Sequence, residues 1–123
     1  MSFLQEAGEW LIVGFFLATG LANLTKGRVA DHVQRMRDFG LPRPAALFWS
    51  GIALQFTGCA LVELGWHPGI GVGCLIVFTI AASAIFHRFW QKSDPVQRNV
   101  SRLTLLGNTA ILGGLLLLLD KVR

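Results

Sequence analysis

The stretch GIGVGCLIVFTIAASAIF, residues 69–86, decides the fold of this chain. It contains no charged residue and no proline, and as a helix rising roughly 1.5 Å per residue it is nearly long enough to cross the ~30 Å hydrocarbon core of a bilayer. Lipid offers backbone N–H and C=O groups no partner, so such a segment satisfies them internally as a helix. We therefore predict a transmembrane helix over 69–86, running on to Trp90.

Three further apolar stretches have the same character, residues 8–24, 45–64 and 103–119, and none has an interior proline, lysine or arginine. The chain is 53% hydrophobic and only 15% charged, whereas soluble domains carry about 25% charged residues. It therefore lacks the polar surface that water requires. The expected fold class is an all-α membrane protein, with residues 1–123 forming a single four-transmembrane-helix domain in contact with the lipid bilayer.

The connections between these stretches differ in character. Residues 25–44 are expected to form a short amphipathic helix on the membrane surface, because apolar residues recur at helical spacing among charged ones. Gly40 and Pro42 then end that pattern. The second connection, residues 65–68, is a tight hairpin, and the third, residues 91–102, contains an Asp-Pro pair typical of a turn or a helix start.

The distribution of lysine and arginine predicts the orientation in the membrane. The side that holds the first and third connections carries nine of the eleven basic residues, and the opposite side carries Lys121 and Arg123. The basic side should be cytoplasmic, with both termini and Trp66 on the opposite side of the membrane. The net charge of +4 would suit nucleic acid, but the basic residues lie only in gaps between apolar runs, so no nucleic-acid partner is expected.

Polar residues inside the predicted spans fall at a common depth, in the half nearer the basic side. They are Thr19 and Asn23, Gln55, the stripe Thr79, Ser83 and His87, and the stripe Ser101, Thr104 and Asn108. Polar side chains are costly against lipid, so these faces should turn inward and meet in a cavity that opens to the cytoplasmic side. The simpler alternative is that they only bond one another and hold the helices together.

A binding role is most plausible for four residues, and the candidate cofactor-binding set is His87, Arg88, Asn108 and Gln55. His87 is the only titratable side chain among the polar stripes, and it lies beside Arg88 at a membrane interface. His32 and His67 lie in connections and are interpreted as solvated or at headgroup level. No metal-ligand spacing exists in the chain.

Small residues and thiols complete the pattern. Gly14, Ala18 and Ala22 should form one groove for close helix approach, and Gly69 and Gly73 another. Two cysteines fall at similar depth on adjacent helices, namely Cys59 and Cys74. They are either a redox pair or buried thiols that act as small apolar groups.

Three segments, in this order, resemble the DoxX family of small four-helix membrane proteins: MRDFGLPRP at 36–44, FHRFW at 86–90 and NTAILGGLL at 108–116. The resemblance implies bacterial or archaeal inner-membrane residence and association with redox systems. Some relatives look like membrane subunits of a thiosulfate:quinone oxidoreductase, and others accompany oxidative-stress enzymes. Relatives often carry Glu where Gln55 stands and Lys where Gly107 stands, and both changes weaken a proton or anion role there.

The leading hypothesis is therefore an accessory or anchoring subunit of a membrane redox assembly, not catalytic on its own, with a quinone or lipid pocket in the cytoplasmic half. A protein partner or a homo-oligomer is expected. One alternative is a membrane oxidoreductase that oxidises a small sulfur compound with quinone as acceptor, although no cofactor motif supports it. Another is a small-solute transporter, which the lack of inverted repeats and broken helices weakens.

Overall fold

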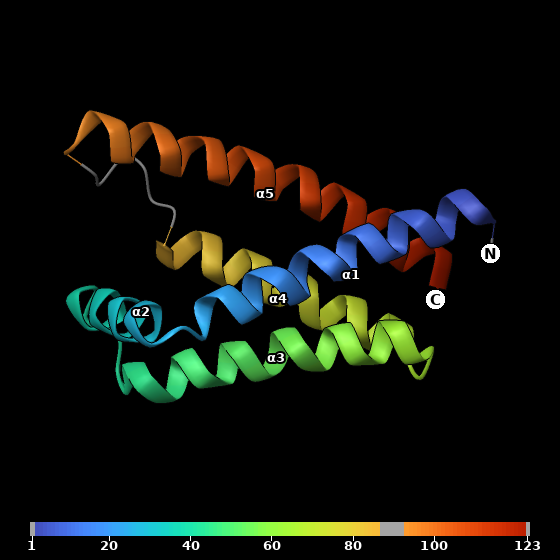
Figure 1. Ribbon diagram of the computed structural model, residues 1–123, viewed down its shortest axis with the longest axis horizontal. Coiled ribbons are helices and arrows are strands. Elements are labelled where there is room, and N and C mark those ends of the chain that lie inside the picture. Colours follow the sequence, from blue (N-terminus) through green and yellow to red (C-terminus); the bar gives the residue numbers. More distant parts are fainter. Residues whose placement is uncertain (1, 87–92, 123) are drawn as a thin grey trace.

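The computed structural model describes residues 2–86 and 93–122, and this part of the chain folds into helices without any strand (Figure 1). The helices are α1 (Phe3–Asn23), α2 (Lys26–Asp38), α3 (Pro44–Leu64), α4 (Pro68–Phe86) and α5 (Pro95–Val122). Both ends of the chain lie beside the α3–α4 connection, at what we call the hairpin end. The opposite end, where α2 lies beside the start of α3, is the α2 end.

The structure has three to four candidate membrane spans, judged by helix length and composition. Three of them, α3, α4 and α5, are long and apolar enough on their own, with mean hydropathies of 1.6, 2.3 and 1.7. The fourth, α1, meets the same criterion only together with α2, from which it is bent by 88°. Its 21 residues correspond to roughly 32 Å of helix. The predicted all-α membrane fold is therefore confirmed.

Local sequence signals begin and end these helices. Ser2 and Gln5 form a capping box at the start of α1, with Ser2 N donating to Gln5 Oε1 at 2.9 Å and Gln5 N donating to Ser2 Oγ at 3.2 Å. Prolines occupy the first position of α3, α4 and α5, where the missing N–H costs nothing. Gly65, at φ +68°, ends α3. The last helix therefore begins at Pro95, earlier than the predicted span at residue 103.

Helices α3 and α4 pack most closely, and two glycines allow it. A Cβ on Gly58 would lie 2.8 Å from the carbonyl oxygen of Gly71, and a Cβ on Gly71 would lie 2.8 Å from Leu61 Cβ. The predicted groove of Gly69 and Gly73 is wrong, because a Cβ at either position would meet nothing within 4 Å. Residue 71 lies about 200° around the helix from residue 69, so the true contact face is nearly opposite.

Helix α1 meets α3 through Gly20, where a Cβ would lie 2.9 Å from Phe56 Cζ and 3.2 Å from Gln55 Cδ. The predicted groove of Gly14, Ala18 and Ala22 on α1 is also wrong, because these residues do not face α3. A Cβ on Gly14 would meet nothing within 4 Å, and Gly14, Ala18 and Ala22 are exposed on the protein surface. The spacing of small residues predicted a groove on each helix, but it did not show which side the neighbouring helix occupies.

Two apolar clusters fill the bundle. The cluster at the hairpin end consists of Val13, Phe16, Cys59, Val62, Val72, Leu75, Leu115 and Leu118. The cluster at the α2 end consists of Met36, Phe48 and Ile52, with Val29 and Val33 of α2 packed against it. The prediction of a short amphipathic helix is confirmed, and its apolar residues pack against α3 and the end of α4. Helix α2 is therefore a cap on one end of the bundle.

Candidate functional site

A cavity of about 630 Å³ lies at the α2 end, and all five helices contribute to its wall. Figure 1 shows α5 diverging from α1 toward this end. Its apolar wall includes Phe15, Phe16, Phe48, Phe78 and Phe86. Its polar groups are Thr19, Asn23, Thr79, Thr104 and Asn108, joined by Arg28, His32 and Arg35 from α2. This size and this mixture of apolar walls with a few polar groups are typical of small-molecule sites.

Most of the predicted polar stripes meet at this cavity. Thr19 and Asn23 reach it from α1, Thr79 from α4, and Thr104 and Asn108 from α5. Thr79 and Thr104 each bond the carbonyl oxygen four residues earlier, Oγ1 to Leu75 O and to Val100 O, both at 2.8 Å. Their hydroxyl protons are therefore used within their own helices, and each oxygen keeps an acceptor site for a ligand.

Gln55 lies behind the cavity wall and not on it. Its side chain is fully buried, and its Nε2 donates to Phe16 O at 2.7 Å and to Thr19 Oγ1 at 3.1 Å. Its Oε1 is buried without a hydrogen-bond partner in the part of the chain that the structure describes. Gln55 therefore connects α3 to α1 and orients Thr19, which does line the cavity. An unpaired buried amide oxygen is costly, and such atoms in native proteins call for an explanation.

Asn108 lies on the cavity wall, as predicted. Its Nδ2 donates to Ser83 Oγ at 3.0 Å, which connects α5 to α4. Of the two candidate residues that the structure describes, Gln55 and Asn108, only Asn108 lies directly on the cavity. The remaining two, His87 and Arg88, lie outside the described residues. They follow directly after Phe86, which is itself part of the wall.

His32 was expected to be solvated or at headgroup level, and the structure shows that its ring also packs against protein. The ring is partly buried, with its centroid 4.9 Å from that of Phe86 and 5.7 Å from that of Phe48. Its Nδ1 lies 2.8 Å from Arg28 O, within hydrogen-bonding distance. Burial lowers the pKa of His32, and the neighbouring Arg35 and Arg28 lower it further, more than offsetting the opposing effects of the Arg28 carbonyl and Asp31.

Two of the three arginines of α2, Arg28 and Arg35, were expected only as the charged face of an amphipathic helix and as orientation signals, yet both line the cavity. Arg28, His32 and Arg35 are separated by four and three residues and so lie on one helix face. That spacing was readable from the sequence. The sequence did not predict that this face turns toward a cavity, because the periodicity of a helix does not show what packs against each of its sides.

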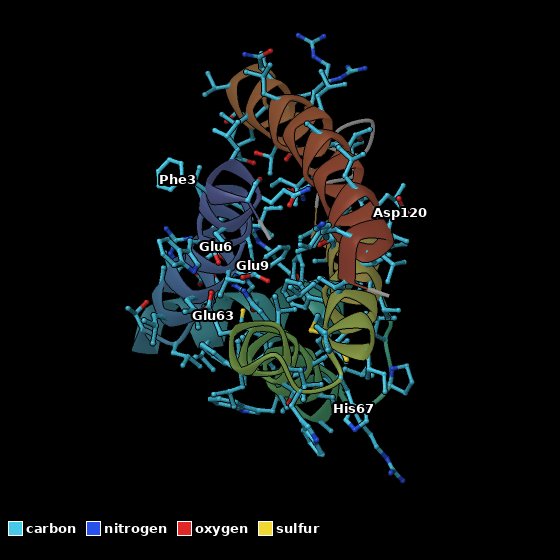
Figure 2. The ribbon with its side chains drawn as sticks, turned by 90° about the vertical axis from the view of Figure 1, so that its right-hand side faces the viewer. Phe3, Glu6, Glu9, Glu63, His67 and Asp120 are labelled. Atoms are coloured by element: carbon cyan, nitrogen blue, oxygen red, sulfur yellow. The ribbon has the colours of Figure 1, made fainter. Side chains whose placement is uncertain are left out.

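The hairpin end has a different chemistry. Figure 2, which views the molecule from this end, shows Glu6 and Glu9 of α1 on the same side as Glu63 of α3, with Asp120 on α5. Cys59 and Cys74 lie toward this half, and both are free thiols. Cys59 is buried, with its Sγ 4.0 Å from Val13 O. Within residues 2–86 and 93–122, no group of three or more His, Cys, Asp or Glu side chains is arranged to hold a metal ion.

A bundle of apolar helices with a cavity near one end defines a multi-pass all-α membrane protein. The family model of DoxX matches residues 10–88, which is well over half of the chain. This protein therefore belongs to the DoxX family. No curated protein and no solved structure matches the chain significantly.

Proposed function

We propose that this DoxX-family protein is an accessory subunit of a membrane redox assembly, not catalytic on its own, and that its cavity binds a membrane-borne amphiphile, either a quinone or a lipid. The cavity carries the proposal. Its wall combines phenylalanine rings with threonine and asparagine side chains from three spans, and it lies at one end of the bundle, where an amphiphile places its polar head. The redox association follows from the family resemblance alone.

The geometry suggests how such a ligand would be held. Asn108 Nδ2 donates to Ser83 and so has one further N–H available. The oxygens of Thr79 and Thr104 can accept a hydrogen bond from a ligand hydroxyl, and the aromatic rings would surround an apolar body. His87 and Arg88 are proposed, from sequence alone, to complete the pocket on the same side.

The orientation belongs to the same proposal. The α2 end, which carries most of the basic residues, is placed on the cytoplasmic side of the inner membrane, with both termini outside. The amphiphile would then enter the cavity from the cytoplasmic leaflet. Labelling of single cysteines introduced at Arg37 and at Trp66 with a membrane-impermeant reagent tests this, since only the position near the hairpin should react in intact cells.

The experiment that tests the binding function is mass spectrometry of the gently solubilised protein, in the wild type and in two matched variants. Ala82→Phe places a ring in the cavity wall, whereas Ala53→Phe makes the same change at an exposed position of α3. We expect a lipid or quinone to co-purify with the wild type and with Ala53→Phe, and to be lost from Ala82→Phe. A preparation that carries no amphiphile, or an Ala82→Phe protein that still carries it, would contradict the proposal.

The redox association needs a separate measurement. Deletion of this protein should lower the quinone-linked activity of its parent assembly, and His87→Ala should lower that activity while leaving the assembly intact. Unchanged activity in both strains would remove the redox part of the proposal and leave amphiphile binding standing on its own test.

A further inference from the structure

The cavity has a strongly basic wall on its α2 side. Arg28, His32 and Arg35 all line it and lie on one face of the helix. Neither guanidinium has a hydrogen-bond or ion-pair partner among the residues that the structure describes. Two permanent positive charges therefore border the cavity without a negative charge bonded to them.

The described part of the chain supplies no acidic side chain to this cavity. Among the described lining residues none is Asp or Glu, and the segment HRFWQK at 87–92 contains none either. Asp31 and Asp38 belong to α2 but are not part of the wall. The Asp38 carboxylate instead accepts a hydrogen bond from Gln34 Nε2 at 2.8 Å. Among the described residues, no acidic side chain of the wall compensates Arg28 and Arg35, and Asp31, which acts on His32 from the same helix, lies outside the wall.

Next to the face formed by Arg28, His32 and Arg35, the cavity wall is apolar. The His32 ring contacts Phe48 and Phe86, and further along the wall Phe16 and Phe78 meet edge to face at 6.3 Å between centroids. Charge and hydrocarbon are thus separated along the cavity, with charge on α2 and aromatic rings on α1, α3 and α4. Because α2 is bent by 88° from α1, it lies across the end of the bundle (Figure 1), which is where the amphipathic helix of a membrane protein meets lipid headgroups.

We propose that the cavity binds an anionic phospholipid, with the phosphate between Arg28 and Arg35 and a hydrocarbon chain along the aromatic wall. The inference rests on the amphiphile-binding function proposed above and assigns the occupant to one class. Arginine is suited to this role because its planar fork donates two parallel hydrogen bonds to phosphate oxygens. A neutral quinone would leave both guanidinium groups uncompensated.

The test uses the full chain, delipidated in a non-ionic maltoside detergent and titrated with phosphatidylglycerol or with phosphatidylcholine of the same acyl chains. Native mass spectrometry counts bound lipids, and the melting temperature follows stabilisation by binding. We expect phosphatidylglycerol to bind at least about tenfold more tightly. Arg28→Gln with Arg35→Gln should abolish that preference. Arg37→Gln with Arg98→Gln removes the same charge from residues at the same end that do not line the cavity, and should preserve the preference.

Several results would overturn the inference. One is equal binding of the two lipids by the wild type, and another is equal loss of preference in the Arg37 and Arg98 control. If inorganic phosphate displaced phosphatidylglycerol at equal concentration, the site would be one for a free anion. If the glutamine variant lacks the wild-type helical circular dichroism, Arg28→Lys with Arg35→Lys replaces it, and that variant should retain part of the preference because charge remains.

The two proposals fail in different ways. A preparation that retains a neutral quinone, and that neither phospholipid displaces, would overturn the anionic-lipid inference but support amphiphile binding. A cavity that holds no amphiphile in the wild type and responds to neither lipid would overturn both.

Discussion

The two halves of this bundle are built from the same four long helices but differ in how closely the helices approach. At the hairpin end, glycine contacts bring α3 within van der Waals distance of α4, and the eight-residue apolar cluster fills the interior. At the α2 end, α5 diverges from α1 (Figure 1), and a cavity of about 630 Å³ occupies the space. Close packing thus stabilises one half, and the other half retains room for a ligand.

The difference teaches where polar residues are tolerated in a membrane bundle. In lipid the hydrophobic effect does not drive helices together, so close van der Waals packing has to do so. The packed half meets that requirement, and its stability allows the other half to hold polar groups around a cavity. The following changes test this division, in order of decreasing expected effect.

Gly58→Ala should be the most damaging. Its Cβ would lie 2.8 Å from a backbone oxygen of α4 and 2.9 Å from Leu75 Cγ, and backbone cannot move aside as a flexible side chain can. We expect a loss of about 3 kcal/mol in the free energy of unfolding, measured by denaturant titration in mixed micelles. Gly73→Ala on α4, where a Cβ meets nothing, serves as the control and should stabilise slightly. Equal effects would show that the close approach at Gly58 is unimportant.

Gln55→Glu should cost about 2 kcal/mol at neutral pH. The new carboxylate would face Phe16 O, which now accepts a hydrogen bond from Nε2, so two acceptors would oppose each other in a fully buried place. A protonated carboxyl donates instead, and the loss should therefore shrink as the pH is lowered. Gln55→Leu removes the unpaired oxygen and should stay within about 1 kcal/mol of the wild type. Thermal unfolding at two pH values distinguishes the variants, and a pH-independent loss would argue against this account.

Asn108→Ala should cost about 1 kcal/mol, the usual size of a polar contact between membrane helices. It removes the bond to Ser83 in the half where packing is loose. The neighbouring Thr109→Ala changes an exposed side chain that bonds only its own helix, Oγ1 to Leu105 O, and should change unfolding by less than about 0.5 kcal/mol. Denaturant titration of both variants tests the contrast, and indistinguishable curves would mean that the Asn108 bond contributes nothing.

The smallest effect should be the pH dependence due to His32. Burial holds its folded-state pKa below the ordinary value of 6.5, so the unfolded chain binds the proton first as the pH falls. The contribution of neutral, buried His32 to the free energy of unfolding is therefore fully present above about pH 6.5. It is lost as the pH falls toward the lower pKa of the folded state. The groups that face the ring are Arg28, Arg35 and Asp31 on α2 and the rings of Phe48 and Phe86.

His32→Gln should flatten the stability profile of the apoprotein between pH 6.5 and lower values, and His67→Gln, an exposed residue at the opposite end, should leave it unchanged. Melting temperatures in detergent across this window provide the comparison. If the melting temperature of His32→Gln still depends on pH as in the wild type, another group is responsible for the titration.

Much of the fold was predictable because its signals are local. An apolar run such as residues 69–86 has one low-energy conformation in lipid, and the prolines at positions 44, 68 and 95 begin the helices that follow them. The shared depth of Thr19, Thr79 and Asn108 follows from helical rise alone, and these side chains do line one cavity.

The errors concern rotation about the helix axis. On α4, Gly71 and not Gly69 meets α3, and on α1 the residue that meets α3 is Gly20 and not Gly14. Lipid and the packed interior are equally apolar, so hydrophobicity does not distinguish a face turned outward from one turned inward. The same uncertainty hid His32, whose neighbours Phe48 and Phe86 are distant in the sequence.

The amino-acid sequence by itself determined that this protein is helical and membrane-embedded, and at what depth each polar residue lies, because hydrocarbon thickness and backbone hydrogen bonding leave no other solution. Only the tertiary structure decided which faces meet, that Gln55 is held behind Thr19, and that two arginines of α2 border a cavity. Those features depend on contacts between distant segments, which the shapes of all five helices settle together.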